Sequence, residues 1–347
     1  MKRSRLLKMT VGLCLIFMLA LLVSAPAFAK AIEITISDHN PPPSSPSQAM
    51  AYWAQKVNEL GAGKLNITVH HGGVLLTGDE AYRGVQGGIV DAAHYALDRR
   101  DGFLLNTVIT LPFMGYPDQR KTGEIYAELR DKFTEVRGEF KGVIPYAFCM
   151  MPPTHIHTAK KVIKTPADLK GMKMHGAEYA LVQVLGLAGA TPVQLDVADM
   201  YMGLDRGLLD GVMNHFPVIL VFRVLPLLPY HTVFGEGGIN MTPMGIVWNE
   251  KKWNSYPRDV QKIITDSAHF YIDKFYEHDA QVQMQAVGLA KENNHTFTEL
   301  TDKEIKVWYD LVKKPFHDKW IEAAEKKGLP GKAVYKYALK LAKKYSK

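Results

Sequence analysis

Histidine is the residue type in this sequence that most suggests site chemistry, since the chain has 13 of them. His155 and His157 stand two residues apart, which places both imidazoles on the same side of a β-strand, where they could bind a metal ion. Alternation alone produces the same pattern in any strand, and no second pair at ligand spacing accompanies this one. A metal-dependent exported enzyme is therefore an alternative, and the favoured interpretation has no metal site.

The motifs of the common enzyme classes do not occur in the sequence. It has no G-x-S-x-G, no P-loop, no G-x-G-x-x-G and no H-E-x-x-H. Cys149 has no protease signature around it. Hydrolase, kinase and dehydrogenase functions lose their usual support, and we expect no catalytic residues and no cofactor.

The N-terminal segment 1–29 has the features of a secretory signal peptide. Its basic start, MKRSRLLK, precedes the apolar run 9–23, and Ala27-Phe28-Ala29 provides the small-x-small cleavage pattern. We therefore expect cleavage after Ala29 and export to the periplasm, with Cys149 as the single remaining cysteine. Four of the basic residues behind the net charge of +7 lie in this segment. The rest of the chain carries about +3, which is too little to indicate a nucleic-acid partner.

The residues after 30 alternate between strand and helix patterns. Apolar alternation predicts strands over 32–36, 65–69 and 89–95, and helices over 44–60 and 78–87 lie between them. This β-α-β-α-β order predicts an α/β fold with a mostly parallel sheet, whose ligands bind beyond the carboxyl ends of the strands.

A spaced motif occurs twice in the chain. Tyr82-x-Gly84-x3-Gly88-x2-Asp91 matches Tyr201-x-Gly203-x3-Gly207-x2-Asp210 at a constant offset of 119 residues. Each copy predicts a helix, a glycine with positive φ, and a strand that begins after the aspartate. Two related lobes are the favoured explanation, and Tyr95 and Asn214 then occupy equivalent positions.

The C-terminal part is predicted to be helical. An apolar pattern from Val260 through Tyr271 and Phe275 continues toward Lys291 and predicts one helix of about 30 residues. At 1.5 Å per residue this helix would be about 45 Å long and would span both lobes.

Several of these segments carry a family resemblance. The run 164–173 (KTPADLKGMK), the segment 189–193 (GATPV) and the segment 209–214 (LDGVMN) resemble solute-binding proteins of tripartite ATP-independent periplasmic (TRAP) transporters, of the DctP type. In the first half, 87–91 (GGIVD) and 111–113 (LPF) are similar too. The resemblance implies a two-lobe α/β binding protein with two mostly parallel sheets, a central cleft and a long lobe-spanning helix. It assigns 30–150 mainly to lobe 1, 151–250 mainly to lobe 2, and 251–347 to the spanning helix and C-terminal helices.

The resemblance also implies a ligand site, which departs from the family pattern at one position. The arginine that grips a carboxylate in the family corresponds to His175, and imidazole offers neither the fixed charge nor the fork of guanidinium. The predicted ligand-binding residues are His39, Tyr95, Arg99, His155, His175, Asn214 and Glu236.

The class of solute stays open at this stage. A small organic acid is favoured, with His175 and Arg99 supplying positive charge. The alternative is a neutral, amine or aromatic solute, with Asp98, Glu178 or Glu236 in the cleft. The implied partners are the solute and the membrane subunits of the transporter, and we expect a monomer.

Overall fold

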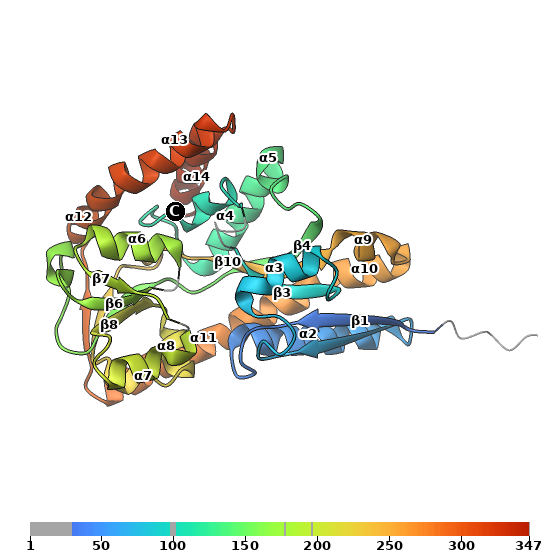
Figure 1. Cartoon of the computed structure of the whole chain (residues 1–347), viewed down its shortest axis with the longest axis horizontal. Coiled ribbons are helices and arrows are strands. Elements are labelled where there is room, and N and C mark those ends of the chain that lie inside the picture. Colours follow the sequence, from blue (N-terminus) through green and yellow to red (C-terminus); the bar gives the residue numbers. More distant parts are fainter. Residues whose placement is uncertain (1–29, 98–101, 177, 196, 347) are drawn as a thin grey trace, which may run out of the picture.

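The computed structural model describes residues 30–97, 102–176, 178–195 and 197–346. They form two β-sheets, each covered by helices, with one long helix along both (Figure 1). The segment 1–29, predicted to be a signal peptide, lies outside the described residues. Among the described helices, none combines the length and the hydropathy needed to cross a membrane.

The first sheet has the strand order β2-β1-β3-β10-β4. β1 is parallel to both β2 and β3, whereas β10 is antiparallel to β3 and β4. The sheet is therefore mixed rather than mostly parallel. Its strands are β1 (Ile32–Ser37), β2 (Leu65–His70), β3 (Ala92–Ala96), β4 (Val143–Met150) and β10 (Pro243–Asn249).

Helices bury both faces of the first sheet. One face packs on a core that includes Trp53, Trp248 and Phe275, and the other on a core around Tyr82 and Phe103. The helices concerned are α2 (Ser45–Gly61), α3 (Gly78–Gln86), α9 (Glu250–Ser255), α10 (Arg258–Asp266) and the first part of α11 (Ala268–Glu292).

The second sheet has the order β11-β9-β5-β8-β6-β7. It is also mixed, because β5 is antiparallel to both of its neighbours while the outer pairs are parallel. Its strands are β5 (His155–Thr158), β6 (Lys173–Gly176), β7 (Thr191–Val193), β8 (Gly211–Asn214), β9 (Tyr230–Val233) and β11 (Thr296–Glu299). The helices on its faces are α6 (Tyr179–Leu187), α7 (Met200–Asp205), α8 (Phe216–Val221) and α12 (Asp302–Val312).

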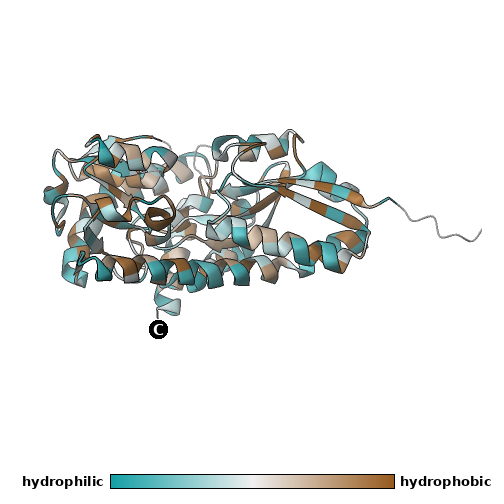
Figure 2. Cartoon of the chain, turned by 90° about the horizontal axis from the view of Figure 1, so that it is seen from below, coloured by the Kyte–Doolittle hydropathy of each residue, from teal (hydrophilic) through white to brown (hydrophobic). Residues whose placement is uncertain are grey.

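The long helix is shorter than predicted. The pattern that begins at Val260 is divided at Ser267 into α10 and α11 (Ala268–Glu292, 25 residues). The Ser267 hydroxyl donates to the carbonyl of Ile264 and accepts from Nε1 of Trp53, so a local side-chain hydrogen bond ends the first helix. α11 still spans both lobes, since Phe275 packs in a core of the first sheet and Ala290 in a core of the second. Figure 2 shows the row of helices along the lower edge, with hydrophilic and hydrophobic residues alternating around it.

A third layer of helices joins the two lobes at their upper side in Figure 1. The core there includes Tyr126, Trp320 and Tyr335. The helices are α4 (Gln119–Lys132), α5 (Thr134–Arg137), α13 (Lys319–Lys326), α14 (Gly331–Tyr345) and a π-helical turn, Lys313–Asp318. Short 3₁₀ turns occur at Asn106–Thr110, Pro166–Leu169, Val197–Asp199 and Leu225–Leu227.

The repeated sequence motif folds in the same way twice. Gly88 and Gly207 have φ values of +79° and +67°. Asp91 accepts from the main-chain N–H of Thr35 at 2.7 Å, and Asp210 accepts from that of Lys173 at 2.9 Å. Each aspartate thus fixes the start of its own strand against the neighbouring parallel strand.

The sheets do not follow the predicted division of the chain in one respect. β10 lies at the end of the range 151–250, which was assigned mainly to lobe 2, yet it pairs in the first sheet. The range 251–347 contributes β11 to the second sheet.

Candidate functional site

A cavity of about 480 Å³ lies between the two lobes. Its first-lobe wall comes from the ends of β1 and β3 and from α3, and its second-lobe wall from β8, α8 and the residue before α6. This is the edge where the carboxyl ends of parallel strands face a crevice, as expected for a ligand site in an α/β fold.

The first-lobe wall is built from residues just beyond β1 and along β3. His39 and Asn40 follow β1. The ring of His39 and the side-chain amide of Asn40 both face His94 of β3. Gly78, the first residue of α3, lets this helix approach the His39 ring, because a Cβ there would lie 3.2 Å from Cδ2 of His39. Tyr95 is buried and packs against Tyr82.

The second-lobe wall contains Asn214, the last residue of β8. Its Oδ1 accepts from the main-chain N–H of His215 at 2.9 Å, which orients the side-chain NH₂ as a donor. Glu178 also lines the cavity, and its Oε2 accepts hydrogen bonds from Asn240 at 2.9 Å and Thr242 at 2.5 Å.

Arg83 supplies a fixed positive charge to the cavity. It lies on α3, its side chain is exposed, and it is one of the lining residues. Within the described part of the chain, the guanidinium has no ion pair or hydrogen bond that would hold it elsewhere.

Much of the remaining lining is apolar. The apolar side chains are Leu97, Met151, Val197, Val218 and Met244. The cavity therefore offers both polar groups and apolar side chains to an organic molecule.

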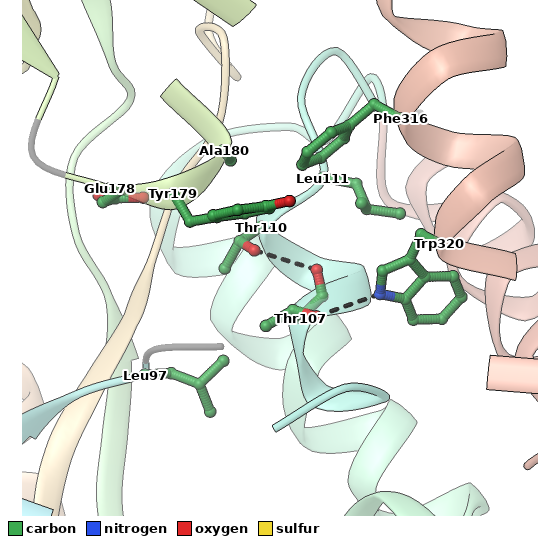
Figure 3. A pocket seen from close by; sticks show the side chains of 9 residues that line it. All are labelled: Leu97, Thr107, Thr110, Leu111, Glu178, Tyr179, Ala180, Phe316 and Trp320. Atoms are coloured by element: carbon green, nitrogen blue, oxygen red, sulfur yellow. Dashed lines mark hydrogen bonds between the residues drawn. The ribbon is translucent and has the colours of Figure 1, made fainter. Parts of the chain in front are cut away.

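A second, much smaller cavity of about 40 Å³ adjoins this one and shares Leu97 and Glu178 with it (Figure 3). Tyr179 lies over it and stacks on Phe316, with ring centroids 6.1 Å apart. At its base, Trp320 donates to the Thr107 hydroxyl at 3.1 Å.

Three of the predicted ligand residues line the central cavity: His39, Tyr95 and Asn214. Arg99, a fourth, lies outside the described residues, as does Asp98.

His175 does not line the cavity. Its side chain is fully buried, and Nε2 contacts the carbonyl of Leu195 at 3.1 Å. β6 lies between β8 and β7 in the second sheet, and Leu195, which contacts the imidazole, belongs to the segment that follows β7. The position that the resemblance aligns with the family's arginine therefore contributes no side chain to the lining of the central cavity.

His155 and Glu236 line a different cavity, of about 610 Å³, on the side of α11. The His155 ring packs near Phe216, and Nδ1 accepts from the main-chain N–H of Phe234 at 3.4 Å. His157 is fully engaged as well, with Nδ1 on His231 and Nε2 on the carbonyl of Asn214. Both ring nitrogens of His157 are therefore engaged, and within the described residues the pair belongs to no group of three possible metal ligands.

The sequence interpretation missed His94, Asn40 and Arg83. His94 stands between apolar neighbours in a predicted strand, so its pattern is that of a core residue. The nearby run Asp38-His39-Asn40 was a usable signal, because polar side chains directly after a strand favour a ligand site. Asp38, His39 and His94 have ligand atoms within 4.8 Å of one another, the one such group of three or more in the described residues.

Two mixed sheets, a cavity between them and a helix that spans both define a two-lobe solute-binding protein. The family model for bacterial extracellular solute-binding protein, family 7 (DctP) matches residues 36–323, and the chain belongs to this family. The family is one of transporter binding proteins rather than of enzymes.

Individual relatives agree with this assignment. The chain is 24% identical over 327 residues to the C4-dicarboxylate-binding periplasmic protein DctP of Rhodobacter capsulatus, which covers 92% of this chain and 95% of that protein. A TRAP periplasmic solute-binding protein from Desulfovibrio salexigens has a TM-score of 0.79 at 26% identity, over 91% of this chain and 97% of the other. A marine metagenome TRAP solute-binding protein, specific for aromatic acids and in complex with 3-hydroxybenzoate, has a TM-score of 0.82 at 25% identity, over 92% and 100%.

Proposed function

We propose that this protein binds a carboxylic acid with an apolar body in the central cavity and delivers it to the membrane subunits of a TRAP transporter. After cleavage of 1–29, the protein would act in the periplasm as a monomer. Closure of the two lobes along α11 would enclose the solute without changing it chemically.

The observation that carries this proposal is the combination of Arg83 with the apolar lining. The Arg83 guanidinium, which has no partner among the described residues, favours an anion at the cavity, and its planar fork matches a carboxylate. The apolar side chains that line the same cavity favour a hydrophobic solute body. Asn214, Tyr95 and His39 then make the remaining polar contacts.

The relatives support an acid. The metagenome protein is specific for aromatic acids, and the Rhodobacter protein is named for C4-dicarboxylates. The amine alternative is less well supported, because the Glu178 carboxylate already accepts two hydrogen bonds from Asn240 and Thr242.

Calorimetric titration with three matched solutes tests the proposal. We expect 3-hydroxybenzoate to bind, and 3-hydroxybenzyl alcohol and 3-hydroxybenzylamine to bind at least 10-fold more weakly. Arg83→Gln should weaken binding of the acid about 10-fold or more, whereas Arg83→Lys should retain part of the affinity. Tighter binding of the amine than of the acid would contradict the proposal.

A further inference from the structure

His94 is the most enclosed polar side chain at the central cavity. It is 1% exposed, lies on β3 and lines the cavity beside His39 and Asn40. Its Nδ1 is 2.9 Å from Nδ2 of Asn40. Its Nε2 is buried and has no hydrogen-bond partner in the part of the chain that the structure describes.

Asp38 determines the orientation of the Asn40 amide. Its Oδ1 accepts from the main-chain N–H of Asn40 at 3.0 Å and from Nδ2 of Asn40 at 2.8 Å. Burial alone would raise the pKa of Asp38, but hydrogen bonds from His71, Ser47 and Asn40 and the proximity of His94 hold it well below its usual value. The carboxylate is therefore ionised and can only accept, so the Asn40 NH₂ group must face it.

The orientation of Asn40 in turn determines the tautomer of His94. Asn40 Nδ2 has two hydrogens, of which one is donated to Asp38 and the other to Nδ1 of His94. A neutral imidazole that accepts at Nδ1 carries its proton on Nε2. Burial, together with the proximity of His39, lowers the pKa of His94 to about 3, so the ring is neutral near pH 7.

We infer that Nε2–H of His94 donates a hydrogen bond to an oxygen atom of the bound solute. This inference rests on the proposed function, because it takes the central cavity as the solute site. The Asp38–Asn40–His94 chain thus presents a neutral, oriented donor on the first lobe. His94 and Arg83 together form a subsite for a carboxylate on the first lobe. This subsite replaces a carboxylate contact from the second lobe, where the side chain of His175 is buried.

The same three-residue chain disfavours a metal ion at Asp38, His39 and His94. Coordination by Nε2 of His94 requires a lone pair there, and the proton would have to move to Nδ1. At Nδ1 it would oppose the donor group of Asn40. If the Asn40 amide turned over instead, its Oδ1 would face the Asp38 carboxylate.

Nitrogen NMR of the ¹⁵N-histidine-labelled protein tests the tautomer directly and needs no ligand. We expect Nε2 of His94 to be protonated and Nδ1 to be unprotonated, with the signal assigned by its loss in His94→Gln. A protonated Nδ1 would overturn the inference. Addition of 3-hydroxybenzoate should shift the Nε2–H signal.

Substitution separates donation from packing. Gln places an amide NH₂ near the position of Nε2, so His94→Gln should stay within about 3-fold of the wild-type affinity for 3-hydroxybenzoate. His94→Leu fills the space without a donor and should bind at least 10-fold more weakly. Equal binding by wild type and His94→Leu would refute the inference and leave the proposed function intact.

Two further outcomes are distinguishable. If the wild type binds none of the three matched solutes although Nε2 is protonated, the proposed function is wrong. The hydrogen bond from His94 to the solute is then wrong as well, because it rests on that function. If Zn²⁺ alone binds the EDTA-treated protein and His94→Leu abolishes that binding, the site is a metal site and the inference is wrong. Circular dichroism melting curves check that each variant folds.

Discussion

His157 and His231 face each other through their Nδ1 atoms, which lie 2.8 Å apart. Nε2 of His157 lies 3.1 Å from the carbonyl of Asn214, so it must be the donor there. His157 then accepts at Nδ1, and His231 donates at Nδ1 and accepts at Nε2 from Nδ1 of His295, 3.1 Å away. Three neutral imidazoles thus form one directed chain from the cavity wall to the end of α11.

This chain of three histidines makes the free energy of unfolding depend on pH. Burial is the main cause that lowers the pKa of His231 to about 3, and it lowers that of His157 well below the usual value. In the unfolded chain both residues take up protons near pH 6.5. The stabilising effect is therefore complete above about pH 6.5 and is lost as pH falls below that value, for His231 down to about pH 3 and by about 1.4 kcal/mol per pH unit. The loss from His157 has the same sign. Urea denaturation at pH 7.5 and pH 5.0 should show lower stability at pH 5.0, and equal stability would contradict the assignment.

Removal of the middle imidazole tests the chain itself. His231→Leu leaves the Nδ1 acceptor of His157 buried without its donor, so we expect a loss of about 1 to 3 kcal/mol of unfolding free energy. His295→Gln, at the partly exposed end, is the matched control and should cost less than about 1 kcal/mol. The prediction fails if the two variants lose the same stability.

Asp279 on α11 should have the opposite pH dependence. Burial raises its pKa to about 6, although hydrogen bonds from Gln119 and Ser45 lower it. The group therefore stabilises the fold fully below about pH 4 and loses this effect as pH rises to 6. We expect Asp279→Asn to stabilise the protein at pH 7.5 by about 1 to 3 kcal/mol and to have little effect at pH 4.

The control for this prediction lies on the same helix. Asp273 is largely exposed and pairs with Arg120 at 3.1 Å. Asp273→Asn should change stability by less than about 0.5 kcal/mol at either pH. Thermal melting curves of both variants provide the measurement, and a destabilised Asp279→Asn at pH 7.5 would contradict the prediction.

Gly78→Ala should weaken solute binding while the fold is preserved. The new Cβ would lie 3.2 Å from Cδ2 of His39, so this partly exposed ring, which lines the cavity, must shift by a few tenths of an ångström. We expect a several-fold higher Kd for 3-hydroxybenzoate and a melting temperature within a few degrees of wild type. Gly288→Ala on α11 is the control, because a Cβ there meets nothing within 4 Å. An unchanged Kd for Gly78→Ala would show that His39 does not contact the solute.

The two aspartates of the repeated motif, Asp91 and Asp210, should stabilise the fold in the same way. Each accepts from the main chain of the adjacent parallel strand, so Asp91→Ala and Asp210→Ala each leave a main-chain donor unpaired. Each carboxylate also pairs with a lysine, Asp91 with Lys252 at 2.8 Å and Asp210 with Lys160 at 3.2 Å. We expect losses of about 1 to 3 kcal/mol, larger for Asp91, because its carboxylate is buried whereas Asp210 is partly exposed. Denaturant titration measures both, and a neutral effect at either position would mean that the two corners are not equivalent.

The sequence predicted those features of the fold that residues close together in the chain determine. The repeated corner was predictable, because a positive-φ glycine and an aspartate before a strand act within a few residues of each other. The sheet that β10 joins was not, since its partners β3 and β4 lie about 100 residues or more away in the chain. Alternation gives His94 and His175 the same buried strand pattern, and only the packed sheets show that His94 reaches the cavity while His175 lies under the segment around Leu195.

The path of the chain has a consequence for how the protein unfolds. Within the described residues it passes between the two sheets three times: after β4, before β10 and along α11. No single cut separates the lobes, and neither sheet is complete within one continuous segment. The first sheet is completed by β10, which follows the strands β5–β9 of the second sheet in the chain, and the second sheet is completed by β11, which follows β10. Heat should therefore melt the whole molecule in one cooperative transition rather than lobe by lobe.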